Sequence, residues 1–195
     1  MKKKIKVLGF AGSLRKGSFN RALLRAAVEM APDDAEIETF DLYGIPPYNQ
    51  DQDNDQPERV KEFKKKIREA DAILIVTPEY NYSIPGVLKN AIDSASRPYS
   101  DNAFDGKPVA VMGASIGMLG TARAQYHLRQ SFVFLNMHPI NQPEVMVPFA
   151  QEKFDESGRL KDEKARGLIR QLLESLVSWS RQVGRGEAAI GEKAA

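Results

Sequence analysis

Short apolar runs along this chain predict five β-strands. Residues 72–77 and 108–113 are almost continuously apolar, as in strands buried on both faces of a sheet. Residues 5–10 form another mainly apolar run, and residues 36–42 alternate between apolar and polar, as an edge or near-edge strand does. Residues 140–147 hold a fifth, poorer pattern. The chain therefore places its strands at intervals along almost its whole length.

Amphipathic stretches lie between and after these runs and predict the helices. Apolar side chains recur at helical spacing over residues 22–30, 60–70, 122–135 and 165–179. Pro85 opens a further helix, because a missing N–H costs nothing in the first turn. Each predicted strand is thus followed by a predicted helix.

This alternation predicts an α/β fold with a five-stranded parallel sheet and helices on both faces. We expect the strand order 2-1-3-4-5, in which a ligand binds beyond the carboxyl ends of strands 1 and 3. No repeat or linker divides the chain. We therefore expect one domain over residues 1–183, and a disordered tail over residues 184–195, which show no periodicity.

The loop after the first strand has the composition of a phosphate site. A strand that turns directly into a helix presents free N–H groups and the positive end of the helix dipole. Ser13, Arg15, Ser18 and Asn20 add hydroxyls, an amide and a guanidinium there. The alternative is a plain turn in which Ser18 caps the helix. The position of this loop at the expected ligand edge favours phosphate.

Two further loops at the same edge have the composition of a site for a flat ring. Residues 78–85 bring Tyr80, Asn81 and Tyr82 to the surface, where a planar heterocycle can stack and be hydrogen-bonded. The alternative for both tyrosines is loop packing or an interface. Residues 113–121 contain three glycines that let bare backbone approach a ligand. Since no Walker motif or Gly-x-Gly-x-x-Gly fingerprint follows the first strand, the three loops together indicate flavin mononucleotide (FMN).

Composition narrows the possible partners and sites. With 28 basic and 26 acidic residues, a net charge of +2 does not favour nucleic acid. There are no cysteines, which excludes disulfides and thiolate chemistry, and only two histidines, so we expect no metal site. No apolar run has the length of a membrane span, so we expect a cytoplasmic protein without a membrane partner.

Three segments carry a family resemblance: GSLRKGSFN at 12–20, PEYNYSIPGVLKNAID at 78–93 and GTARAQYHLRQ at 120–130. With them the chain resembles the NADPH-dependent FMN reductase family, in its branch of chromate and quinone reductases. The resemblance runs from about Lys4 to Val183. It implies a flavodoxin-like fold, bound FMN, and two-electron reduction by NADPH or NADH.

The resemblance also implies roles for individual residues. Ser13, Arg15, Ser18 and Asn20 would hold the phosphate; Pro78, Glu79, Tyr80 and Asn81 would flank the isoalloxazine; and Ser115 and Gly117 would approach it from the third loop. No residue acts as a catalyst, because hydride transfer occurs at the flavin N5. For Glu79 we favour a structural carboxylate over a proton donor.

A homodimer or homotetramer is the family expectation. The polar cluster of Tyr82, Arg123, Tyr126 and Glu144 is available for hydrogen bonds between subunits. The alternative is that these side chains are solvated or cover the flavin mouth.

We expect an oxidoreductase that passes two electrons from NAD(P)H through FMN, by a ping-pong mechanism, to small-molecule acceptors. The acceptors considered are quinones, azo compounds, free flavin and chromate. The alternative is a flavodoxin-like electron carrier without a nicotinamide substrate, which usually has strong charge asymmetry. A phosphoacceptor receiver domain is set aside, because Thr77 and Pro78 follow the third strand where it needs an aspartate.

Overall fold

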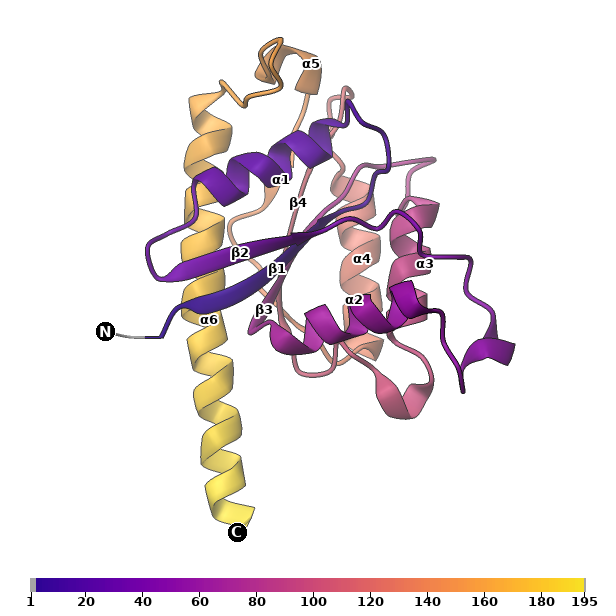
Figure 1. Cartoon of the computed structure of the whole chain (residues 1–195). Coiled ribbons are helices and arrows are strands. Elements are labelled where there is room, and N and C mark those ends of the chain that lie inside the picture. The colour runs from indigo at the N-terminus through magenta and orange to yellow at the C-terminus, as the bar shows by residue number, and fades with distance from the viewer. Residues whose placement is uncertain (1–2, 195) are drawn as a thin grey trace.

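The protein is a parallel sheet with helices on both faces, as seen in a computed structural model (Figure 1). The structure describes residues 3–194, with side chains described for 3–184. The strands are β1 (Ile5–Ala11), β2 (Ala35–Phe40), β3 (Ala72–Val76), β4 (Pro108–Ala114), β5 (His138–Pro139) and β6 (Val145–Val147). Their order is β2-β1-β3-β4-β5, with β6 also paired to β4, and every pairing is parallel. The predicted fold class and strand order are confirmed.

The helices divide between the two faces of the sheet. Helices α1 (Phe19–Glu29) and α6 (Glu163–Ala194) cover one face, and α2 (Glu58–Glu69), α3 (Gly86–Ala95) and α4 (Ala122–Phe134) cover the other (Figure 1). Short 3₁₀ turns η1 (Gln50–Gln52) and η2 (Tyr99–Asp101) lie in connecting loops. Within residues 3–184, no helix is long and apolar enough to cross a membrane.

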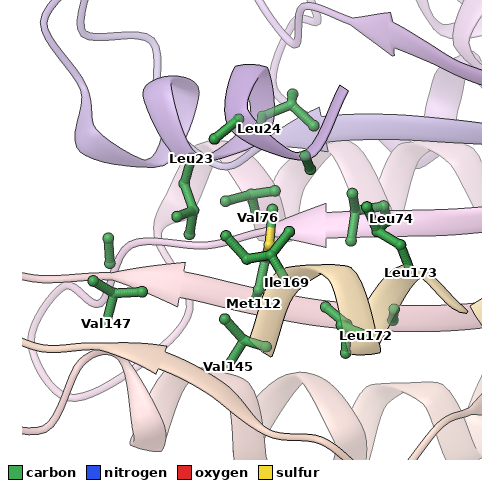
Figure 2. Close-up of a cluster of buried hydrophobic side chains, with 14 of the residues drawn as sticks. Leu23, Leu24, Leu74, Val76, Met112, Val145, Val147, Ile169, Leu172 and Leu173 are labelled. Carbon is green, nitrogen blue, oxygen red and sulfur yellow. The ribbon is translucent and has the colours of Figure 1, made fainter. Parts of the chain in front are cut away.

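Alternation along each strand produces two cores. In β3, Leu74 and Val76 face α1 and α6, while Ile73 and Ile75 face α2, α3 and α4. Figure 2 shows the first core, where Leu23 of α1 and Ile169 of α6 meet the strands. Because every residue of β3 is buried, its continuous apolar pattern marks the centre of the sheet.

The fifth predicted strand, 140–147, is broken in the structure. β5 and β6 pair with opposite ends of β4 and are separated by residues 140–144. Pro139 ends β5 and Pro143 lies within the gap. A proline has no N–H with which to extend a ladder of hydrogen bonds between strands. The short helix α5 (Ala150–Lys153), which the sequence pattern does not predict, follows β6.

Helix α6 continues to Ala194, through the segment 184–195 for which the sequence predicts a disordered tail. The alanines, glutamates and lysine of this segment favour helix, which offsets its glycines. Side chains after Gly184 lie outside the described part of the chain, as does Ala195. The domain limit at Val183 stays a prediction.

Asp162 begins α6 by capping its first turn. Its Oδ1 accepts a hydrogen bond of 2.8 Å from the Ala165 N–H, and its Oδ2 lies 2.6 Å from Lys153 Nζ. Lys153, and then the Ala165 N–H, hold the pKa of this carboxyl below its usual value. The carboxylate form therefore stabilises the point where α6 enters the fold.

We expect Asp162→Asn to lower stability near neutral pH, because the asparagine keeps an acceptor for Ala165 but loses the charge. A depressed pKa in the folded state stabilises the protein above the unfolded value of about 3.9. That contribution is lost as pH falls through the folded pKa. Urea midpoints of wild type and variant should therefore converge as the pH is lowered from about 7 to about 3. An undiminished difference in acid would contradict the assignment.

Candidate functional site

Three loops meet at the carboxyl edge of the sheet, where the strand order reverses between β1 and β3. We call them the first loop (residues 12–18), the second loop (77–85) and the third loop (115–121). The sheet ladder fixes where they start: Gly12 N–H donates to Val76 O and Thr77 N–H to Met112 O, each at 2.9 Å. The predicted meeting of the loops is thereby observed.

The first loop presents backbone donors. Ser18 caps α1, since its Oγ accepts from the N–H groups of Asn20 (3.2 Å) and Arg21 (3.4 Å). The capping alternative for Ser18 is thus correct, and it is compatible with a ligand. Within the described part of the chain, the backbone N–H groups of Leu14, Lys16 and Gly17 have no acceptor.

Arg15 and Ser13 lie in the same loop. The Arg15 side chain is exposed, with its guanidinium carbon 5.8 Å from the centre of the Phe19 ring. Ser13 is buried, and its Oγ accepts from the Arg15 N–H at 3.4 Å. This set of free N–H groups, hydroxyls and one exposed guanidinium fits a phosphate.

Asn20, a predicted phosphate ligand, makes two hydrogen bonds to the backbone of β4, and its role toward a phosphate stays a prediction. Its side chain is 3% exposed and lies against the last residue of β4. Asn20 Nδ2 donates to Ala114 O, and Ala114 N–H donates to Asn20 Oδ1, each at 2.9 Å. Because the amide uses both polar atoms on this backbone, Asn20 ties the first loop to the third.

The second loop ends in a tight turn. Tyr80 and Ser83 exchange backbone hydrogen bonds of 3.1 and 2.9 Å, and between them Asn81 and Tyr82 have φ of 49° and 64°. Two consecutive positive φ values are those of a type I′ turn. Tyr80 is 53% and Tyr82 67% exposed. The loop therefore places aromatic faces and an amide in solvent, as predicted, while Pro78 behind them is buried.

Glu79 fixes this loop to α4. Its Oε2 accepts from the N–H groups of Arg123 (3.0 Å) and Ala124 (3.2 Å), and its Oε1 accepts from Arg123 Nε (2.6 Å) and also pairs with Nη2. Thr121, the N-cap position of α4, makes no side-chain cap, so Glu79 takes over that function from another loop. These contacts support the structural alternative for Glu79.

The four residues proposed for subunit contacts form two pairs within the chain. The Arg123 guanidinium lies 3.5 Å from the centre of the Tyr82 ring. Tyr126 is hydrogen-bonded to Glu144, and this bond, together with the negative charge, raises the pKa of the tyrosine. Their role between subunits stays a prediction.

The third loop depends on glycine for its shape. A Cβ on Gly113 would lie 2.1 Å from Thr121 Oγ1 and 2.3 Å from Thr77 O, and one on Gly120, at φ 54°, would meet the backbone of Val147. Thr121 itself has φ 79°. The absence of a Cβ at these two glycines therefore lets the third loop pack closely against Thr77 of the second loop and against β6.

Ser115 and Gly117, the predicted contacts from this loop, lie at its rim. Gly117 is exposed and its N–H donates to Ser115 Oγ at 3.1 Å. Ser115 N–H donates to Val147 O, and Ala150 N–H donates to Ser115 O, each at 3.0 Å. The rim is thus held by β6 and α5.

Comparison with known proteins identifies the family. The model of the NADPH-dependent FMN reductase family matches residues 5–152. The chain belongs to this family. An NAD(P)H-dependent FMN reductase of Pseudomonas aeruginosa is 56% identical over 180 residues, which cover 92% of this chain and 97% of that protein. A 2-hydroxy-1,4-benzoquinone reductase of a Burkholderia species is 42% identical, covering 91% of this chain and 97% of that protein.

A solved structure of a related oxidoreductase has the same fold. The NAD(P)H:(acceptor) oxidoreductase FerB of Paracoccus denitrificans superposes with a TM-score of 0.84 at 36% identity, over 91% of this chain and 98% of that one. Membership of the FMN reductase family confirms that the chain is an oxidoreductase with FMN as cofactor and NAD(P)H as co-substrate. The alternative of an electron carrier is not supported.

Two contacts around the site are not predicted from the sequence. Gly113 and Thr121 form a close contact that no local pattern announces, and Ser83 Oγ lies 2.8 Å from His127 Nδ1. Ser83 and His127 are 44 residues apart, and Gly113 and Thr121 lie at the two ends of a nine-residue segment. Only the glycine-rich composition of the third loop signals such close approach.

We expect Gly113→Ala to destabilise the protein by about 3 kcal/mol, the upper end of overpacking costs, because its methyl group meets a backbone carbonyl. The matched control is Gly167→Ala in α6, where a Cβ meets nothing within 4 Å. It should gain about 0.5–1 kcal/mol by its helix propensity. Urea unfolding measures both, and a Gly113→Ala variant as stable as wild type would contradict the close packing of the loops.

Proposed function

We propose that this FMN reductase passes two electrons from NADPH or NADH, through FMN held by the three loops, to quinones and related small acceptors. The observation that carries the proposal is the group of unpaired N–H donors at the start of α1, beside two loops that offer aromatic faces and bare backbone. The quinone reductase names of relatives at 42–44% identity support quinones as acceptors. We include azo compounds, free flavin and chromate among the acceptors that the proposed enzyme reduces.

The first loop would hold the phosphate. We assign the free N–H groups, the Ser13 and Ser18 hydroxyls and the Arg15 guanidinium to its oxygens. Asn20 supports this loop indirectly, because its two hydrogen bonds to Ala114 keep the first loop beside the third. The proposal thus retains Asn20 in the site as a support for the phosphate loop.

The second and third loops would hold the ring. Pro78, Glu79, Tyr80 and Asn81 flank it on one side, and Ser115 and Gly117 approach it on the other. When bound, FMN accepts hydride at N5 and releases two electrons, so the protein supplies no catalytic acid or base. Its part is to orient the ring and to exclude water.

We also propose a homodimer or homotetramer in the cytoplasm. The exposed Tyr82, with the partly exposed Arg123, and the Tyr126–Glu144 pair offer polar groups to a second copy. Light scattering of the purified protein measures this state directly.

We expect the protein to bind one FMN per chain and to prefer FMN to riboflavin, which lacks the phosphate. Arg15→Ala removes a charge-assisted bond worth about 1.5–3 kcal/mol, or roughly tenfold to a hundredfold in Kd. Arg170→Ala, at an exposed position of α6, removes an equal charge elsewhere and is the control. Fluorescence titration of the apoprotein gives the constants. Equal affinity for FMN and riboflavin would refute the phosphate assignment.

We expect ping-pong kinetics. The nicotinamide must lie flat on the open face of the ring, at near-attack distance, and a quinone acceptor needs the same face. Both cannot be bound together, because the loops cover the other sides. Double-reciprocal plots at several quinone concentrations should therefore be parallel. Intersecting lines would instead demonstrate a second binding position.

A further inference from the structure

The ion pair between Glu79 and Arg123 links two of the loops that surround the proposed flavin position. Glu79 belongs to the second loop, and Arg123 is the second residue of α4, directly after the third loop. Glu79 Oε1 lies 2.6 Å from Arg123 Nε, and its Oε2 accepts from the N–H groups of Arg123 and Ala124. One carboxylate thus neutralises a guanidinium and the N-terminus of a helix together.

The carboxyl group has no part as a proton donor in this geometry. Every group bonded to its two oxygens is itself a donor: the Arg123 guanidinium and the N–H groups of Arg123 and Ala124. Both oxygens therefore act as acceptors in every contact that they make. The function of Glu79 must therefore come from its charge and its position.

The pair is asymmetric in its exposure. The side chain of Glu79 is 7% exposed, whereas that of Arg123 is 37% exposed and lies against the face of Tyr82. Charges shielded from water act over longer distances than solvated ones. Removing either partner would leave the other as an uncompensated charge beside the ring loops, and the two charges have opposite signs.

We propose that Glu79 and Arg123 are a positioning pair whose mutual neutralisation keeps either charge from shifting the reduction potential of bound FMN, and which holds the second loop in register with α4. The proposal rests on the proposed FMN site. Reduction adds negative charge to the flavin, so a nearby positive charge favours reduction and a negative one opposes it. In the intact pair the two effects largely cancel.

The test is the two-electron midpoint potential of FMN-loaded protein, measured by anaerobic titration against a reference dye. Glu79→Gln keeps an oxygen for the α4 N–H groups and leaves Arg123 unpaired, so the potential should become more positive. Arg123→Met leaves Glu79 unpaired, so the potential should become more negative. The double variant should return close to wild type. Damage to the structure alone would not move the two single variants in opposite directions.

Two kinds of control accompany these variants. Asp162→Asn and Lys153→Met break a similar carboxylate–lysine cap at the start of α6, outside the three loops, and should leave the potential unchanged. Arg123→Lys keeps the charge and should hold the wild-type potential, even if Arg123→Met folds poorly. FMN affinity of each apoprotein is measured beside the potential, so that weaker binding is separated from a shift in potential.

The outcomes separate the two proposals. If wild-type protein binds no FMN, the proposed function fails and this inference fails with it. If it binds FMN, the inference is overturned when both single variants shift the potential in the same direction, when neither shifts it, or when Arg123→Lys behaves like Arg123→Met. Opposite shifts with restoration in the double variant establish the pair.

Discussion

The two hydrogen bonds between the Asn20 side chain and the backbone of Ala114 are the constraint on which the shape of the site depends. They join residues 94 positions apart, each bond at 2.9 Å, in a place where Asn20 is almost completely buried. Buried polar groups are costly without partners, so this contact forms in one geometry only. It fixes the start of α1 to the end of β4, and thereby the free N–H groups of the first loop to the backbone of the third loop.

The second loop is joined to β4 and α4 by an ion pair and by close packing against a glycine. Glu79 caps α4 from across the site, and the missing Cβ of Gly113 leaves room for both Thr77 and Thr121. None of the three loops therefore has an independent position. This rigidity suits a protein whose cofactor carries the chemistry, because the protein's contribution is to hold a ring and a donor in one orientation.

The sequence predicts what is local and misses what is distant. Periodicity gives β1 to β4 and the five long helices, and the alternation of strand and helix gives the sheet order, since these depend on neighbouring side chains. The break between β5 and β6 escapes it, because the weak pattern over residues 140–147 predicts a single strand although Pro143 lies within it. The sequence predicts which loops meet, and the residues assigned to the site stay predictions. The contacts of individual side chains, such as the bonds of Asn20 to Ala114, are decided by parts of the chain that only folding brings together.

Helix α6 has a consequence for how the protein is made. Ile169, Leu172, Leu173 and Leu176 cover the same face of the sheet as α1, next to Leu74 and Met112 (Figure 2). Synthesis runs from the N-terminus, so the four long strands leave the ribosome before the helix that covers them has been translated. During that interval the apolar face is only half covered, which exposes the nascent chain to aggregation and to chaperones. The last helix to be made thus ends the vulnerable period of the whole domain.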